Sequence, residues 1–236
     1  RRLLDQADVI ADLLGDLGEG KETLRIAVSH TIAEYHLSPE LVAYQTGQRQ
    51  QRPLELTAGN SQMVRRAVAE GRAEIGIAGN RLPDDREDRL EELELLDDEI
   101  VLAVPESHPW HRREAVGREE FLRTPLIARD PGAHGRRLGD SVLASFRERL
   151  APPLLEVGSS AAAKREALEL DTPILLSALA LDEERDRLYR RTIEGLRFPR
   201  RFLIVSRAFD DLRASERELI EFLRRRKLTV LPASPG

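Results

Sequence analysis

A stretch of this chain repeats itself 99 residues later, and this repeat constrains the fold more than any other feature of the sequence. Residues 59–70 (GNSQMVRRAVAE) align with residues 158–169 (GSSAAAKREALE). Each copy predicts a strand, a Gly-Ser turn, a helix, a turn and a second strand. Two ordinary strand–helix–strand units can resemble each other by chance. The alternative, which we favour, is that the repeat indicates two lobes built alike.

Apolar strand patterns alternate with helical patterns along most of the chain. Strands are expected at residues 24–28, 54–58, 74–78, 93–96, 100–104, 125–128, 154–157, 174–177 and 202–206. Helices are expected at residues 32–44 with an interruption near Pro39, at 62–70, 136–150 and 161–168, and from a Ser215/Glu218 capping box to about Arg226. This alternation predicts an α/β fold with parallel sheets and helices on their faces.

The first segment of the chain predicts a helix with a narrow apolar seam. Leu3, Ala7, Ile10, Leu14 and Leu17 repeat with the spacing of a coiled coil. Glycines within residues 15–20 then indicate the end of the helix and a linker. The seam suits a dimerisation helix, or a helix that packs on its own domain.

Composition limits the classes to which the protein can belong. Apolar residues make up 41% of the chain and charged residues 33%, which predicts a globular protein. Lys and Arg number 37 against 42 Asp and Glu, so a net charge of −5 offers no overall basic surface for nucleic acid. The lack of cysteine excludes disulfides and thiolate metal sites and fits the cytoplasm. No apolar run approaches the ~20 residues that span a bilayer, and the first residues lack the apolar core of a signal peptide, so no membrane partner is expected.

Hydroxyl and amide side chains follow three predicted strands, at the starts of the next helices. They are Ser29 and Thr31 after the first strand, Asn60 and Ser61 after the second, and Ser159 and Ser160 in the second copy of the repeat. Helix N-termini leave backbone N–H groups free and favour anions, and ligands of α/β sheets collect at the carboxyl ends of strands. Each of these residues could instead only cap its helix. Taken together, the three turns predict a ligand site.

One charged residue joins this set. Arg129 ends a predicted strand and could bind an anionic ligand through two parallel hydrogen bonds. The alternative is a surface ion pair with Asp130 or another carboxylate.

Motifs for catalysis, cofactors and metals are weak or absent. Residues 15–22 (GDLGEGKE) have phosphate-loop spacing, but Glu22 stands where a Ser or Thr must bind Mg²⁺, and the segment lies between a helix and a strand. His108 and His111 beside Glu106 are better explained by a turn than by a metal. No nucleophile–base pair is found, so we expect neither an enzyme nor a cofactor or metal site.

An ordered set of motifs resembles the effector-binding, or substrate-binding, domain of LysR-type transcription regulators. The matching stretches are LRIAVSHTIAEYHLSPELVAYQ (24–45), LELTAGNSQMVRRAVAEGRAEIGIAG (54–79), DDEIVLAVPESHPW (97–110), PLIARDPGAHGRR (125–137) and LLEVGSSAAAKREAL (154–168). The resemblance implies a type 2 periplasmic-binding-protein-like fold of two Rossmann-like lobes joined by two crossover strands. Lobe I would comprise residues 24–97 and 206–232, lobe II residues 98–205, and residues 1–20 the linker helix that pairs subunits.

The same resemblance implies a site and partners. The effector cleft would be lined by Ser29, Thr31, Asn60 and Ser61 from lobe I and by Arg129, Ser159 and Ser160 from lobe II. A small molecule, which we expect to be an anion, would bind there and shift the lobes about hinges near Ile100 and Phe202. We expect a homodimer or homotetramer that contacts DNA only through an N-terminal helix-turn-helix domain missing from this chain. A solute receptor of a transporter, or an enzyme on the same fold, are the alternatives.

The sequence departs from the family pattern in one place. The family has a glycine-rich turn after the second lobe's helix, where this chain has residues 169–173 (ELDTP). Leu170 stands where the first copy of the repeat has Gly71. We therefore expect a different turn at this point, and the sequence leaves open whether the turn alters the cleft.

Overall fold

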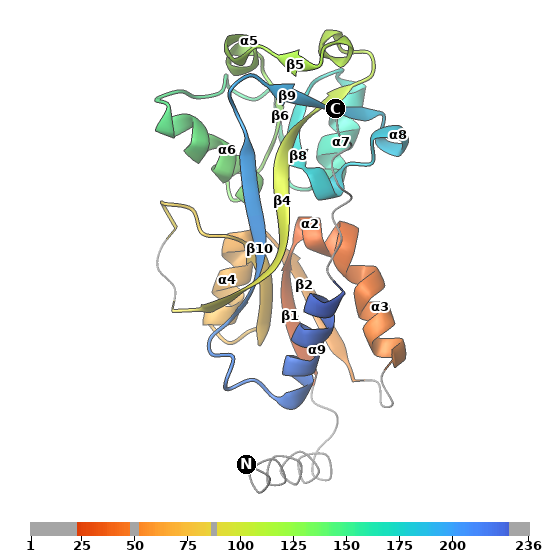
Figure 1. Cartoon of the computed structure of the whole chain (residues 1–236), viewed down its shortest axis with the longest axis vertical. Helices are drawn as coiled ribbons and strands as arrows, with labels where there is room; N and C mark the ends of the chain where they lie inside the picture. Colours follow the sequence, from red (N-terminus) through yellow and green to blue (C-terminus); the bar gives the residue numbers. More distant parts are fainter. Residues whose placement is uncertain (1–22, 48–51, 86–88, 227–236) are drawn as a thin grey trace, which may run out of the picture.

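The protein consists of two α/β lobes joined by two long strands, as seen in a computed structural model that describes residues 23–47, 52–85 and 89–226 (Figure 1). The predicted seam of residues 1–20 lies outside the described residues. Lobe I contains β1 (Leu24–Ser29), α2 (His30–Ile32), η1 (Ala33–Leu37), α3 (Ser38–Gly47), β2 (Leu54–Gly59), α4 (Ser61–Ala69), β3 (Ile75–Gly79) and α9 (Ala214–Arg225). Lobe II contains η2 (Pro109–Arg112), β5 (Ala115–Val116), α5 (Arg118–Arg123), β6 (Ile127–Arg129), α6 (His134–Ser145), β7 (Leu155–Val157), α7 (Ser160–Glu169), β8 (Ile174–Ser177), η3 (Ala178–Ala180), α8 (Glu183–Asp186) and β9 (Leu188–Ile193). The crossover strands are β4 (Glu91–Pro105) and β10 (Phe198–Ser206).

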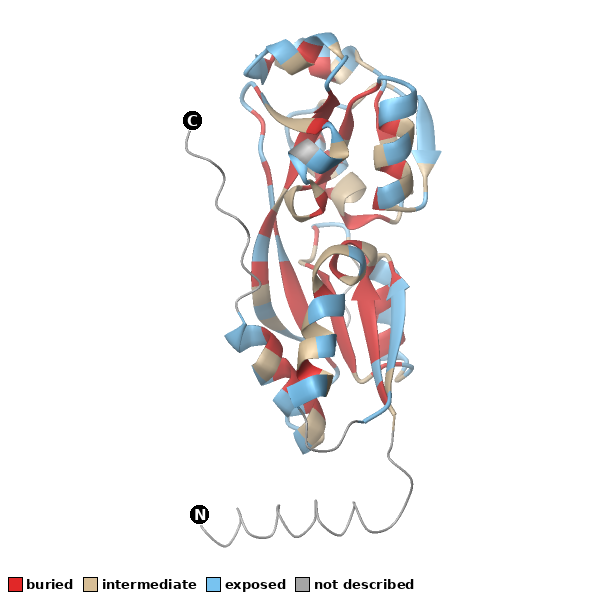
Figure 2. Ribbon diagram, turned by 90° about the vertical axis from the view of Figure 1, so that its right-hand side faces the viewer, coloured by how far each residue is buried: buried red, intermediate tan, exposed pale blue. Residues whose placement is uncertain are grey.

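One continuous sheet runs through both lobes in the strand order β2-β1-β3-β10-β4-β8-β6-β7. In lobe I, β1 is parallel to β2 and β3; in lobe II, β6 is parallel to β7 and β8. Buried residues gather on the strands and on the inner faces of the helices (Figure 2). Because successive side chains of a strand alternate between its faces, apolar strands such as β1 and β3 are covered by helices on both sides.

The crossover region differs from the prediction of two strands at residues 93–96 and 100–104. The chain forms the single strand β4 of 15 residues, and the acidic residues between the two predicted strands are part of it. Asp97 lies opposite Arg201 and Asp98 opposite Arg200 in the antiparallel register with β10. Cross-strand pairs of opposite charge stabilise a sheet, so the acidic run is compensated by its neighbour strand and does not end β4.

Two helices also differ from their predicted bounds. The helix around Pro39 is not interrupted: η1 is a π-helical segment that continues directly into α3, where Pro39 occupies the first turn. Pro39 has no N–H to donate to the preceding turn, and it directly follows the π-helical segment, where the regular pattern of α-helical hydrogen bonds already changes. The helix expected at 136–150 begins at His134 and ends at Ser145, because the chain turns at Arg147 with a positive φ of 60°.

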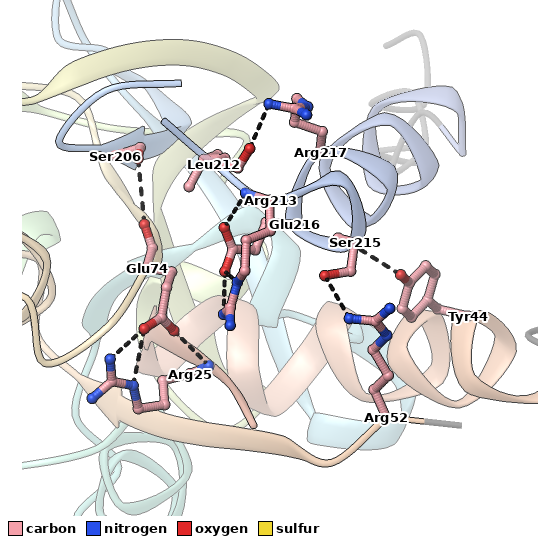
Figure 3. A network of polar contacts seen from close by, with 10 residues as sticks. All are labelled: Arg25, Tyr44, Arg52, Glu74, Ser206, Leu212, Arg213, Ser215, Glu216 and Arg217. Atoms are coloured by element: carbon pink, nitrogen blue, oxygen red, sulfur yellow. Dashed lines mark hydrogen bonds and ion pairs between the residues drawn. The ribbon is translucent and has the colours of Figure 1, made fainter. Parts of the chain in front are cut away.

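The start of α9 is capped two residues earlier than predicted. The Glu216 carboxylate accepts a hydrogen bond of 2.7 Å from the backbone N–H of Arg213, whereas Ser215 lies within the helix. Ser215 instead accepts hydrogen bonds from Tyr44 and Arg52, through its carbonyl and its hydroxyl (Figure 3). This network ties α9 to α3 and stiffens the end of lobe I remote from lobe II.

Candidate functional site

The carboxyl ends of the parallel strands of both lobes point toward the gap between the lobes. Ser29 at the end of β1 lies opposite Gly59 at the end of β2, and Arg129 ends β6. The helical segment beginning with α2 and helices α4, α6 and α7 start at this gap, so their N-terminal ends face it. Short βα connections place these polar residues there: α2 begins directly after β1, α4 one residue after β2 and α7 two residues after β7, whereas four residues separate β6 from α6.

A cavity of about 40 Å³, here called the interlobe cleft, lies where these ends meet. Its polar lining is Ser29, His30, Thr31, Asn60, Ser61, Arg129, His134, Arg136, Ser160, Ser177 and Arg200. Three of these residues are arginines, and none of the described residues that line the cleft is Asp or Glu. A water molecule needs roughly 10–15 Å³, so the lobes in this arrangement enclose a space for a few waters or one compact group.

The structure brings six of the seven predicted site residues to this cleft. Ser159 is the exception: its hydroxyl accepts a hydrogen bond of 3.1 Å from the Ala162 N–H and caps α7, so it does not line the cleft. Asn60, at the same place in the first repeat, caps α4 through Met63 N–H at 3.0 Å and also lines the cleft. Ser159 therefore only caps its helix, which is the alternative that the sequence left open. Asn60 both caps its helix and lines the cleft.

The matched serines of the repeat have different partners. The buried Ser61 hydroxyl accepts from the Gly79 N–H at 3.0 Å, within lobe I. The buried Ser160 hydroxyl accepts from Arg129 Nη1 at 2.8 Å, within lobe II. In lobe I, Ser61 therefore binds the backbone at the end of β3, whereas in lobe II, Ser160 binds the side chain of Arg129 at the cleft.

Arg129 is held mainly by neutral groups. Besides Ser160, its Nη2 donates to the Gly158 carbonyl at 3.0 Å and reaches Asp130 only at 3.4 Å. Its side chain is 11% exposed. The ion pair with Asp130 that the sequence offered as an alternative is thus present but long. Asp130 therefore compensates the positive charge of Arg129 only weakly, and this charge is available to a ligand in the cleft.

A buried ion pair at the crossover strands adds residues that sequence reasoning missed. Arg200 Nε donates to Asp98 Oδ2 at 2.5 Å, and the Ser177 hydroxyl donates to the same oxygen at 2.7 Å. The Arg200 guanidinium stacks over the Phe202 ring at 4.5 Å and lines the cleft. Burial lowers the pKa of Arg200, Asp98 opposes this change, and Arg129 adds to it by like-charge repulsion. The sequence shows only an acidic run in β4 and a basic run in β10. No local pattern specifies the register between these strands, which pairs Asp98 with Arg200.

His134, at the start of α6, is a second missed residue. Its Nε2 lies 2.7 Å from the Asn80 carbonyl of lobe I, and a carbonyl can only accept, so Nε2 carries the proton. The ring lies against Gly79, where an added Cβ would come within 2.5 Å of it. Burial, and then Arg200, lower the pKa of His134 to about 4, so the imidazole is neutral at pH 7.

Comparison with known proteins agrees with this architecture. The sequence profile of the LysR substrate binding domain matches residues 17–227. This chain belongs to the LysR substrate-binding domain family. An uncharacterized HTH-type transcriptional regulator of Mycobacterium tuberculosis is 33% identical over 195 residues, which cover 78% of this chain and 61% of that protein. A probable RuBisCO transcriptional regulator of Guillardia theta is 28% identical over 189 residues, covering 78% and 60%. The chain thus spans about three fifths of the length of these relatives.

Solved structures share the fold. The regulatory domain of Synechocystis CcmR in complex with 2-PG superposes with a TM-score of 0.76 at 19% identity, covering 91% of this chain and 99% of that one. The effector binding domain of QuiR in complex with shikimate gives a TM-score of 0.73 at 14% identity, covering 88% and 98%. The two lobes are therefore a LysR effector-binding domain with a type 2 periplasmic-binding-protein-like fold, as the sequence predicted.

The lobes of this LysR domain touch on both sides of the cleft. On one side, Arg137 of α6 forms ion pairs with Asp84 at 2.9 Å and Asp85 at 2.6 Å, and Leu82 inserts into the apolar core of lobe II. On the other, the Lys164 ammonium of α7 lies 4.7 Å from the centre of the Tyr35 ring. These contacts stabilise the present orientation of the lobes, and a change in orientation has to break or slide them.

The departure from the family pattern at residues 169–173 changes the turn less than expected. Asp171 adopts the left-handed conformation, with φ 46°, that Gly71 adopts in lobe I with φ 70°. In both turns the N–H of the left-handed residue bonds back three residues and the next N–H reaches Ala67 or Ala167. Helix α7 is one residue longer than α4, and Asp171 provides the turn one position later. The turn therefore differs in position and in lacking a glycine, as predicted, but keeps the hydrogen-bond pattern of the first copy.

The groups that the sequence analysis set aside have structural roles. His108 Nδ1 accepts from the Trp110 N–H at 3.2 Å and caps η2. Within the described part of the chain, no group of three or more His, Cys, Asp or Glu is arranged to hold a metal ion. Nor does any helix in that part combine the length and apolar character required to cross a bilayer.

Proposed function

We propose that this chain senses a small anion in the interlobe cleft and, within a LysR-type regulator, passes the resulting change in lobe orientation to DNA-bound subunits. The observation that carries the proposal is the lining of the cleft: among the residues that the structure describes, polar side chains from both lobes converge there with three arginines and without a carboxylate. The proposed ligand-binding residues are Ser29, Thr31, Asn60, Ser61, Arg129 and Ser160, joined by Arg200.

The chemistry of the lining favours an anion. The Arg200 guanidinium is buried, the Arg129 side chain is 11% exposed, and the two are close enough to repel each other. Of the two, Arg200 has the shorter contact with a carboxylate, 2.5 Å against 3.4 Å. Helices α4, α6 and α7 add the positive ends of their dipoles at the same place. A negative group between the arginines would relieve their repulsion.

A ligand that bridges the lobes can act as a switch. Ser29, Thr31 and Asn60 would bind it from lobe I, and Arg129 from lobe II. Such a ligand favours the orientation in which both sets of contacts form. Coupling of ~1–3 kcal/mol changes an equilibrium about 5–150-fold. The hinges would lie in β4 near Ile100 and β10 near Phe202, where the strands pass from one lobe to the other.

The relatives support the wider setting of the proposal. The structural neighbours include domains in complex with 2-PG and with shikimate, and the sequence relatives are HTH-type or RuBisCO transcriptional regulators. By analogy, the regulator would be a cytoplasmic homodimer or homotetramer that contacts DNA through a helix-turn-helix domain. The apolar seam of residues 1–20 and exposed apolar side chains such as Val42 and Leu155 are consistent with self-association.

A thermal-shift screen tests the proposal. Small carboxylates and phosphates should raise the melting temperature of the chain, and neutral or cationic compounds of similar size should not. Arg129→Met and Thr31→Val should each weaken binding of a hit, measured by calorimetry. Arg25→Met is the matched control, because Arg25 lies at the opposite end of β1 and is 45% exposed. Hits that are only neutral or cationic, or anion binding equally strong in Arg129→Met and Thr31→Val, would contradict the proposal.

A further inference from the structure

Four buried polar atoms at the interlobe cleft have no hydrogen-bond partner among the described residues. They are Ser29 Oγ, Arg129 Nε, Arg200 Nη2 and His134 Nδ1. All four residues line the cleft, and three of them, Ser29, His134 and the Arg200 side chain, are at least nine-tenths buried. An unpaired buried polar atom costs roughly 1–3 kcal/mol, so such a concentration at one cavity indicates the groups that a ligand completes.

These atoms differ in what they require of a ligand. Arg129 Nε and Arg200 Nη2 can only donate, and they call for an anionic acceptor. The Ser29 hydroxyl can rotate to donate or to accept, so it does not discriminate between ligands. His134 Nδ1 is the exception, because its ring donates through Nε2 to the Asn80 carbonyl. In the neutral ring, which a pKa of about 4 maintains at pH 7, Nδ1 therefore only accepts.

The position of the imidazole is also fixed. Its Nε2 is held at 2.7 Å by a carbonyl of lobe I, and one ring edge lies on Gly79, where a side chain would collide with it. An added Cβ at Gly135, the next residue, would come within 3.9 Å of Arg200 Nη1, so the start of α6 lies beside the arginine that would bind the anion. An acceptor and anion-binding donors thus line one small cavity.

We propose that the effector presents an O–H donor next to its anionic group, and that His134 Nδ1 accepts the hydrogen bond from that O–H while Arg129 and Arg200 bind the anion. The inference rests on the proposed function of the cleft and narrows its ligand to hydroxycarboxylates or oxyanions that retain a proton. An anion of equal size and charge without the O–H leaves Nδ1 unpaired and binds about tenfold more weakly, since one lost hydrogen bond amounts to roughly 1.4 kcal/mol.

Two matched pairs of probes test this inference by calorimetry at pH 7.5. Hydrogen phosphate and sulfate are dianions of the same shape that differ by one proton. Glycolate and propionate are monoanions in which a hydroxyl replaces a methyl group. In at least one pair the member with the O–H should bind about tenfold more tightly, and the pair that does so identifies the oxyanion or the hydroxycarboxylate as the source of the donor.

Variants of His134 assign the preference. His134→Leu removes the acceptor and should abolish the preference, whereas His134→Gln can keep both a donor for Asn80 and an acceptor and should retain it. Where a variant does not fold, ¹⁵N spectra of the wild type decide, because the His134 Nδ1 resonance should move with the O–H member of a pair and not with the other.

Equal affinities within both pairs in the wild type would overturn the inference, as would a preference that survives His134→Leu. In either case the proposed function stands if Arg129→Met still weakens the anions that bind. If no probe binds, or if binding is adventitious and indifferent to Arg129→Met, the proposed anion site fails as well.

Discussion

The buried ion pair between the crossover strands should make Asp98 one of the most sensitive positions in the protein. The Asp98 side chain is 0% exposed and the Arg200 side chain 4%, with Nε and Oδ2 2.5 Å apart. Asp98→Ala leaves a buried guanidinium without its counter-charge and removes the acceptor of the Ser177 hydroxyl. Breaking such a pair from one side costs about 3–5 kcal/mol, a large share of the 5–15 kcal/mol that stabilises a typical domain.

The assay is urea unfolding followed by the fluorescence of Trp110, the single tryptophan, which is 2% exposed in lobe II. Asp97→Ala is the matched control, because the neighbouring Asp97–Arg201 pair joins the same strands but Asp97 is 81% exposed. It should leave the unfolding midpoint near that of the wild type. The double variant Asp98→Leu/Arg200→Met should recover most of the loss, since it leaves no unpaired buried charge. The reasoning is refuted if Asp98→Ala costs no more than Asp97→Ala, or if the double variant is no more stable than Asp98→Ala.

Three further outcomes follow from particular residues. Ser159→Ala should lower the unfolding free energy by about 1 kcal/mol through loss of the α7 cap and leave anion affinity unchanged. Thr31→Val should weaken anion binding and leave the unfolding free energy nearly unchanged; unfolding and calorimetry on both variants check this. Neutral His134 contributes stability that is complete above its ordinary pKa of 6.5 and is lost as the pH falls toward about 4, in total about 3 kcal/mol; unfolding measured between pH 7 and 4 should show this slope in the wild type and lose it in His134→Gln. Deleting residues 1–20 should weaken self-association without unfolding the lobes, and sedimentation of a strictly monomeric full chain at tens of micromolar would contradict the predicted seam.

Much of the fold could be predicted because it depends on local patterns. Short apolar runs such as those of β1 and β3 are bounded by polar turns, and the repeat of residues 59–70 at 158–169 indicated the two similar lobes. Errors arose where a contact distant in sequence overrides a local pattern. The acidic run in β4 continues the strand because β10 compensates it, and Arg147 ends α6 although the apolar pattern runs on.

The site was predictable to the extent that it follows from strand ends. Ser29, Thr31, Asn60 and Ser61 reach the cleft because each ends or follows a parallel strand. The same rule could not tell that the Ser159 hydroxyl caps its own helix instead. Arg200 lies in the middle of a strand, where no rule about turns applies. Finding it requires the register that places it against Asp98 and beside the cleft.

The central claim is that the interlobe cleft holds an anion, and diffraction from crystals grown with arsenate tests it most directly. Arsenate is a phosphate analogue that keeps an O–H donor and scatters anomalously. We predict an anomalous peak between Arg129 and Arg200, within hydrogen-bonding distance of both guanidinium groups and of Ser29. The result that would contradict the account is arsenate bound only at surface arginines, with the cleft occupied by water alone.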